Sequence, residues 1–168
     1  MKNIVLLILC VLFTQCIFLE KDDVLPVATP YTGNQLKING YYYQISNDNI
    51  IYLPFIMYRN GVITEIANHR NTLEEMDEYI KSSYVNGTRY KNNKYLWGVF
   101  FINDNFVIFH RLNQDYPHHE NIREGIILND TTIQIIKYSS ANYETIQNEV
   151  YHFREFSPKP DSTNVYIK

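Results

Sequence analysis

The sequence predicts a mainly β protein: an antiparallel meander of about eight strands that forms a small barrel or barrel-like sheet, with one helix packed on it. Tyr and Phe, which favour strands, number 15 and 9 among the 168 residues. Short apolar segments alternate with turns that contain Asn, Asp or Gly, so consecutive strands are expected to pair as hairpins. One segment, about 72–85, has the apolar spacing of a helix instead.

The first predicted elements are strands. Leu36–Ile45 is one strand, and Ile50–Arg59 and Val62–Ala67 form a hairpin about Asn60-Gly61, the dipeptide typical of a tight two-residue turn. With that loop, six apolar residues share one face that we expect to be core: Ile51, Leu53, Phe55, Met57, Val62 and Ile66. Pro54 falls on the opposite face and lacks an N–H, which places this strand at an edge or at a bulge.

The predicted helix begins at a capping box, in which Thr72 is followed by Glu75. A stripe of apolar residues continues at helical spacing: Leu73, Met76, Ile80 and Tyr84. Asn86-Gly87 is typical of a helix end. The stripe indicates that the helix packs on the sheet, and the acidic residues between its members indicate a solvated face.

Tyr95–Leu112 carries a strong hairpin signal, since two apolar, aromatic runs flank the polar tip 103–105. With a two-residue loop, Trp97 lies on one face and Gly98 on the other, and both faces are largely apolar. Each face therefore needs cover. We expect the interior of the sheet on one side and the helix on the other, with Gly98 allowing close approach.

The rest of the domain is predicted as a polar loop at 113–122, strands at Arg123–Leu128 and Thr131–Tyr138, a loop or weak helical turn at 139–148, and a last strand at Glu149–Phe156. The turn at Asn129-Asp130 gives this second hairpin a core face of four residues: Ile126, Leu128, Ile133 and Ile135. The prolines that follow end regular structure.

The N-terminus is typical of a lipoprotein signal peptide over residues 1–15. Its apolar core, Ile4–Phe13, is shorter than the roughly 20 residues that span a bilayer. Leu12–Cys16 resembles a bacterial lipobox, which implies cleavage before Cys16 and its acylation, with the lipid bilayer as a partner. Both cysteines lie in this leader, so the body has no disulfide. The alternative is ordinary secretion, with Cys16 incidental.

After the signal peptide we expect the lipidated Cys and a tether at 16–35, a β-rich domain at 36–157 and a C-terminal tail at 158–168. The run Glu20–Asp23 resembles the surface-export signal of flavobacterial-type lipoproteins; its other interpretation is a solvated charge run. The expected location is the cell envelope, as an outer-membrane lipoprotein, and the export interpretation places it on the cell surface.

Four segments resemble those of uncharacterised Bacteroidota (flavobacterial-type) lipoproteins: Gly40–Tyr43, Trp97–Phe100, Gly125–Thr132 and Tyr151–Thr163. The resemblance spans most of the body and implies no particular activity. The meander with an early strand of Gly and aromatic residues is also similar in outline to lipocalin-like barrels. That similarity concerns architecture and carries no function with it.

Several function classes are disfavoured. The net charge of −3 leaves no basic footprint for nucleic acid. The sequence has no Gly-x-Ser-x-Gly motif, phosphate loop or dinucleotide fingerprint. Metal-capable side chains concentrate at His118, His119 and Glu120, with Asp115 nearby, but without a zinc spacing. We favour a solvated loop there, and expect no metal or cofactor.

Four polar residues lie inside otherwise apolar strands: His110, Arg111, His152 and Arg154. If these residues converge at the mouth of a barrel, they suit an anionic or polar ligand. The other interpretation places them at strand ends or on a solvated outer face.

The leading functional hypothesis is a membrane-anchored, non-enzymatic domain that binds a small hydrophobic or amphipathic ligand. A hydrophobic ligand inside the barrel needs an apolar cavity of roughly 300 Å³. The alternative is an envelope interaction or accessory protein, whose exposed tyrosines meet a partner protein or a glycan. A third hypothesis, a metal-assisted hydrolase at His118 and His119, has the least support, so we do not expect an enzyme.

Overall fold

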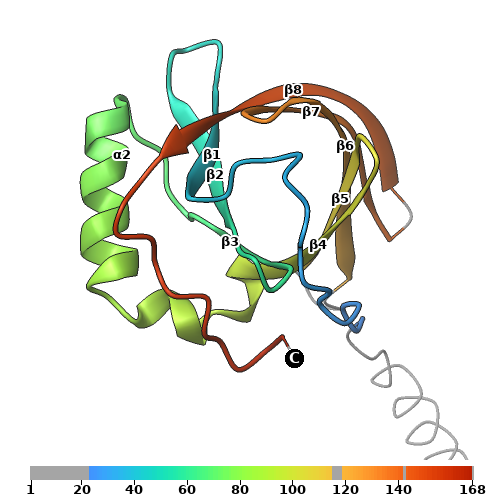
Figure 1. Cartoon of the computed structure of the whole chain (residues 1–168), viewed down its shortest axis with the longest axis horizontal. Coiled ribbons are helices and arrows are strands. Elements are labelled where there is room, and N and C mark those ends of the chain that lie inside the picture. The colour runs from blue at the N-terminus through green and yellow to red at the C-terminus, as the bar shows by residue number, and fades with distance from the viewer. Residues whose placement is uncertain (1–22, 115–118, 142, 168) are drawn as a thin grey trace, which may run out of the picture.

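The computed structural model describes residues 23–114, 119–141 and 143–167, and it forms a closed antiparallel barrel (Figure 1). Each strand pairs with the next along the chain, and the last strand pairs with the first. The predicted fold class is confirmed. The predicted signal peptide, Cys16, Asp115 and His118 lie outside the described residues.

The eight strands are β1 (Gly40–Ile45), β2 (Ile51–Met57), β3 (Val62–Glu65), β4 (Trp97–Asn103), β5 (Phe106–Leu112), β6 (Glu120–Asn129), β7 (Thr132–Ser140) and β8 (Tyr143–Glu155). The connection from β3 to β4 carries the helix α2 (Leu73–Ile80), a π-helical turn η1 (Lys81–Val85) and two 3₁₀ turns, η2 (Arg89–Asn92) and η3 (Lys94–Leu96).

The β4–β5 hairpin has the predicted two-residue loop. Asn103 pairs with Phe106, and Asp104 has the positive φ of 55° that such a turn requires. One prediction about this hairpin is wrong. Gly98 faces the barrel interior, where an added Cβ would meet the carbonyl oxygen of His110 and the side chain of Ile63. It therefore permits close approach of the strands, and the helix packs on the opposite face.

The β2–β3 hairpin turns through three residues rather than two. The N–H of Tyr58 donates to the carbonyl of Val62 at 2.9 Å, and Gly61 closes the loop with φ 83°. Because strand side chains alternate, a register shift of one residue moves them to the other face. Of the predicted core face, Phe55 and Met57 point into the barrel, whereas Val62 lies outside it, under the helix.

The predicted bulge at Pro54 is confirmed. The pairing of β1 with β2 shifts between Tyr42 and Gln44, opposite the stretch that contains Leu53 and Pro54. Leu53 has a positive φ of 41°. This bulge explains why Ile51 lies outside the barrel with the helix, although Phe55 lies inside.

The β6–β7 turn also falls one residue later than predicted. Asn129 pairs with Thr132, and its side-chain oxygen accepts hydrogen bonds from the N–H and the hydroxyl of Thr131 at 2.9 and 2.8 Å. A bulge between Ile127 and Asn129 then shifts the pairing, so that Ile127 faces Ile133 and Leu128, a predicted core residue, is 51% exposed. Ile126 likewise pairs with Gln134 rather than with the core residue Ile133.

The predicted loop at 139–148 is wrong, since most of it is strand. β7 continues to Ser140, and β8 begins at Tyr143. The backbone groups of this stretch are paired in a ladder that runs from Ile135 opposite Glu149 to Ser140 opposite Tyr143. The β7–β8 hairpin is therefore long, and β8 curves over the barrel in Figure 1.

Two apolar clusters hold the fold together. The inner cluster fills the barrel and includes Tyr42, Phe55, Phe100, Phe109 and Tyr151. The outer cluster joins α2 and its flanking turns to the outside of the barrel through Tyr41, Ile56, Met76, Ile80 and Trp97. Both bury large aromatic rings, each of which contributes up to a few kcal/mol of hydrophobic stabilisation.

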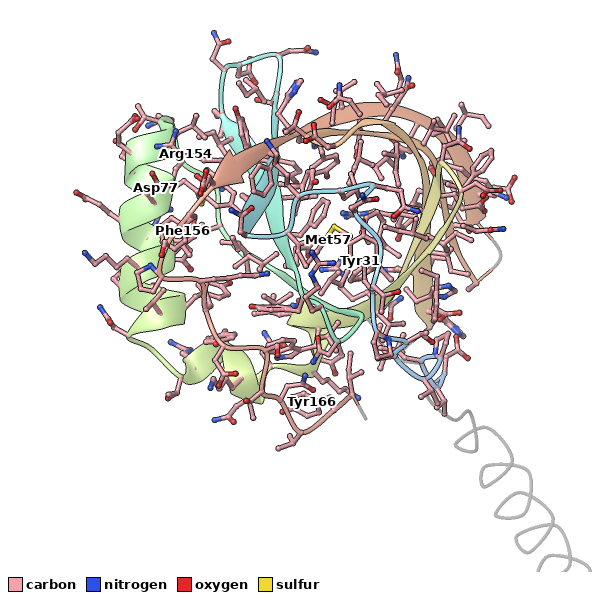
Figure 2. The ribbon with its side chains drawn as sticks, viewed as in Figure 1. Tyr31, Met57, Asp77, Arg154, Phe156 and Tyr166 are labelled. Carbon is pink, nitrogen blue, oxygen red and sulfur yellow. The ribbon has the colours of Figure 1, made fainter. Side chains whose placement is uncertain are left out.

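The predicted helix and its cap are confirmed. The Thr72 hydroxyl accepts from the N–H of Glu75 at 3.2 Å, and the Glu75 carboxylate accepts from the N–H of Asn71 at 3.1 Å. The Arg154 guanidinium on β8 donates hydrogen bonds to the Asp77 carboxylate on the helix, with a closest N···O distance of 2.6 Å (Figure 2).

The segment before β1 and the C-terminal tail close one end of the barrel. Tyr31, Leu36 and Ile38 are buried in the inner cluster. The packed domain therefore begins before Leu36, its predicted first residue, and includes part of the predicted tether. The N–H of Lys37 donates to the carbonyl of Asp130 at 2.8 Å. From the C-terminal tail, Lys159 donates to the backbone carbonyls of Ile38 and Met57. No comparable segment in the described part of the chain covers the opposite end, which we call the open end.

Candidate functional site

The barrel interior is filled. The inner cavity measures about 20 Å³, room for about one water molecule, and lies among Phe55, Ile63, Phe109, Ile135 and Tyr151. It is far smaller than the roughly 300 Å³ that a bound hydrophobic ligand needs. Any ligand of that size must therefore lie toward the open end.

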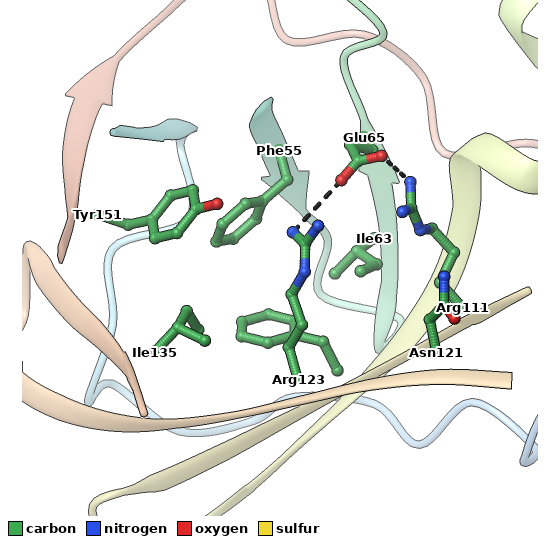
Figure 3. Close-up of a pocket in the computed structure, with 9 residues that line it drawn as sticks. Phe55, Ile63, Glu65, Arg111, Asn121, Arg123, Ile135 and Tyr151 are labelled. Carbon is green, nitrogen blue, oxygen red and sulfur yellow. Dashed lines mark ion pairs between the residues drawn. The ribbon is translucent and has the colours of Figure 1, made fainter. Parts of the chain in front are cut away.

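A buried ion cluster lies between this cavity and the open end (Figure 3). Glu65, only 6% exposed, is in contact with Arg111, and the Arg123 Nη1 lies 3.3 Å from its other carboxylate oxygen. Two guanidinium groups thus share one carboxylate. Burial, followed by the neighbouring charge of Arg123, lowers the pKa of Arg111 to about 10. The cluster carries excess positive charge in a poorly solvated place.

Two buried polar atoms beside this cluster have no hydrogen-bond partner among the described residues: the Tyr151 hydroxyl and the Asn121 side-chain oxygen. Both residues line the same cavity. Burial raises the pKa of Tyr151 to about 12, and the nearby Glu149 carboxylate adds to the rise, so the hydroxyl is protonated at neutral pH and can donate. Buried polar groups are nearly always paired in folded proteins, so these two mark a place where a partner belongs.

A larger hollow of about 310 Å³ opens outward from the cluster. It shares Arg111, Asn121, Arg123 and Ile135 with the inner cavity, so the two are continuous. Its outer wall comes from the long arms of β7 and β8: Tyr138, Tyr143, Thr145, Gln147 and Glu149. The Tyr138 and Tyr143 rings lie 6.3 Å apart. We call the hollow and the cavity together the barrel mouth.

Of the four residues predicted to bind a ligand, Arg111 alone lines the barrel mouth. His110 lies on the other face of β5, with its Nδ1 2.8 Å from Glu120 Oε1. His152 is exposed beside the ring of Tyr43. Arg154 is engaged by Asp77 on the helix. The four do not converge, because neighbours in a strand point to opposite faces.

The sequence analysis missed Glu65, Asn121 and Arg123. Arg123 and Asn121 have the same parity along β6 as Ile127, which packs against the inner cluster. Counting back from a correctly placed Ile127 would have put both inside the barrel. The bulge between Ile127 and Asn129 was not predicted, and without it the inner face falls to Ile126 instead.

A second hollow of about 720 Å³ lies beside the helical connection, lined by Tyr79, Tyr84 and Tyr90 among others. Two of these three hydroxyls have partners within the protein. The Tyr84 hydroxyl accepts from the N–H of Ala67 at 3.0 Å, and that of Tyr90 donates to the carbonyl of Asp161 at 2.9 Å. Because these hydroxyls are already engaged within the protein, the barrel mouth is the better candidate.

Within the described ranges, no group of three or more His, Cys, Asp or Glu side chains is placed to hold a metal ion. His119 lies 3.4 Å from Asp23, and Glu120 contacts His110. None of the helices in the described part of the chain is long and apolar enough to cross a membrane.

Comparison with known proteins adds no assignment: no family model, curated protein or solved structure matches the chain.

Proposed function

We propose that this protein is a non-enzymatic binding protein that holds a small amphipathic ligand in its barrel mouth. The observation that carries the proposal is a hollow of about 310 Å³ whose base presents buried polar atoms without partners. The volume is at the lower end of the range for small-molecule sites. We further propose that the protein meets its ligand in the cell envelope, anchored through Cys16.

The lining suits an amphipathic molecule. At the base, the guanidinium groups, Asn121 and the Tyr151 hydroxyl offer hydrogen bonds, and on the wall Tyr138 and Tyr143 offer ring faces. The lining contains donors and rings suited to binding, and it includes neither His nor Cys. The polar end of the ligand therefore sits inward, against the polar base, and its apolar part lies along the tyrosine wall. The cavity behind the base is nearly filled, so the ligand cannot enter more deeply.

Native mass spectrometry of the protein purified from its own envelope tests this proposal. Tyr143 is 61% exposed on the wall of the mouth, and Tyr52 is 46% exposed on β2, outside the lining. We expect a small-molecule adduct that persists in Tyr52→Ala and is lost or reduced severalfold in Tyr143→Ala. Absence of any adduct, or equal occupancy in both variants, contradicts the proposal.

The alternative, an envelope partner bound through surface tyrosines, has less support. Seven tyrosines are buried in the core: Tyr31, Tyr41, Tyr42, Tyr58, Tyr84, Tyr90 and Tyr151. The abundance of tyrosine therefore largely serves the two apolar clusters, and it no longer argues for a tyrosine-rich contact surface.

A further inference from the structure

The base of the barrel mouth points to the chemical class of the ligand. We infer that the polar end of the ligand is a carboxylate, bound by Arg123 and Arg111 in competition with Glu65. The inference rests on the proposed function, because it names the chemistry recognised at that same site.

The two arginines of the ion cluster share one paired carboxylate. Arg111 and Arg123 form ion pairs with Glu65, and Arg123 is the more loosely held, at 3.3 Å. Glu149 also lines the hollow, but no ion pair joins it to either arginine in the described part of the chain. Planar guanidinium groups match carboxylates through paired N–H···O contacts. A carboxylate that enters from the hollow would complete the contacts of Arg123.

The Tyr151 hydroxyl is also suited to an anion. Tyr151 is fully buried and lines the cavity together with both arginines. Its hydroxyl makes no well-aligned hydrogen bond among the described residues, and the Glu149 carboxylate nearby raises its pKa. A phenolic O–H donates well to a carboxylate oxygen. The Asn121 side chain lies at the same place, with its oxygen free to accept from a protonated group next to the ligand's carboxylate.

The position of Glu65 explains how the site exists without its ligand. Two buried arginines without any counter-ion would carry a large desolvation penalty. The Glu65 carboxylate, held on β3 opposite Phe55, offsets that penalty. An incoming carboxylate therefore competes with Glu65 for Arg123, so Glu65 weakens binding while it stabilises the empty site.

The test compares an acid with its neutral analogue. 4-Phenylbutyrate carries a carboxylate and a ring that can lie on the tyrosine wall, and 4-phenylbutanamide has nearly the same shape without the charge. Isothermal titration of the mature chain should show the acid binding at least roughly tenfold more tightly than the amide. Equal affinities would overturn the carboxylate inference and leave the proposed function standing; no binding of either compound would overturn both.

Three variants make the test specific. Arg123→Gln should weaken binding of 4-phenylbutyrate by roughly tenfold or more and leave the amide unchanged. Lys137→Gln is the control: it removes one positive charge near the mouth, from a lysine paired to Glu124 and Glu144 outside the lining. Equal losses of affinity in both would show nonspecific attraction and contradict the inference.

Glu65→Gln should change the affinity for 4-phenylbutyrate in the opposite direction. Removal of the competing carboxylate should strengthen binding of 4-phenylbutyrate severalfold, although the empty protein becomes less stable. A general loss of structure cannot produce tighter binding, so this result separates recognition from stability. Weaker binding of the acid by a folded Glu65→Gln protein would overturn the competition. Should that variant fail to fold, Arg123→Gln and the comparison of acid with amide still decide the inference.

Discussion

The two ends of the barrel each hold half-buried cations, but they complete the contacts of these cations in different ways. At the closed end, the Lys159 ammonium donates to the carbonyls of Ile38 and Met57 and lies 4.5 Å from the centre of the Tyr58 ring. At the open end, Arg111 and Arg123 share the Glu65 carboxylate beside polar atoms that have no partner.

The difference shows what a closing segment does. Chain from residues 29–38 and the C-terminal tail covers one end and forms backbone hydrogen bonds there, although the buried Tyr58 hydroxyl has no partner among the described residues. In the described part of the chain, no comparable segment covers the mouth, where a hollow of about 310 Å³ remains. The closed end thus stabilises the fold, and the open end retains unsatisfied polar groups that a ligand can use.

The largest expected effect comes from opening the closed end. Tyr31→Ala removes a buried ring that packs edge-on against Phe100 at 5.8 Å, and it removes the hydroxyl that accepts from the N–H of Leu36. We expect a loss of about 3–5 kcal/mol in the free energy of unfolding, measured by urea denaturation. Tyr143→Ala at the mouth is the control and should change it by less than about 0.5 kcal/mol. Similar losses at both ends would break the comparison.

The same conservative substitution should have opposite signs at the two ends. The Tyr42 hydroxyl donates to the carbonyls of Lys37 and Asp130 at 2.9 and 3.3 Å, so Tyr42→Phe should cost about 1–2 kcal/mol of stability. The Tyr151 hydroxyl has no partner among the described residues, so Tyr151→Phe should stabilise the empty protein by about 1 kcal/mol.

Thermal or urea unfolding of both Phe variants at pH 7 checks this pair. Tyr151→Phe should at the same time weaken binding of 4-phenylbutyrate severalfold. A destabilised Tyr151→Phe protein would mean that the hydroxyl already has a partner in the empty state. The empty mouth would then present no unpaired Tyr151 hydroxyl to a ligand.

The smallest effect is a pH dependence at the closed end. Burial, followed by the charge of Arg59, lowers the pKa of Lys159 to about 8, against 10.5 for an ordinary lysine. Between about pH 8 and 10.5 the unfolded chain binds the proton and the folded one does not, so stability rises with pH in that window. Lys159 lies near the surface, in the tail, so we expect a rise below about 1 kcal/mol. Lys159→Met should flatten the slope of unfolding free energy against pH; an unchanged slope contradicts the assignment.

Much of the fold could be predicted from local sequence because its signals act over a few residues. The β4–β5 turn and the Thr72–Glu75 cap depend on side chains next to one another in the chain. The two register errors had local causes of another kind. A glycine at positive φ lengthened one loop, and a bulge between Ile127 and Asn129 shifted the pairing of the other hairpin. Each one-residue error exchanged the inner and outer faces of a strand.

The candidate site could be predicted only in part. Four polar residues lie within apolar strands and were therefore assigned one role: His110, Arg111, His152 and Arg154. In the structure their side chains point in different directions. Glu65 gave no signal in the sequence, because its role depends on arginines 46 and 58 positions further along the chain, a separation that follows from the numbering of Arg111 and Arg123.

By itself, the sequence determined most of the strands and the helix, because apolar periods of two and of three to four residues are local properties. It also predicted a barrel, since short connections join consecutive strands. Tertiary structure alone decided which end of the barrel is closed and which polar side chains face inward. Those outcomes depend on the pairing of β8 with β1, on bulges and on the docking of distant segments. Burial then turned ordinary surface residue types into the charged base of a binding site.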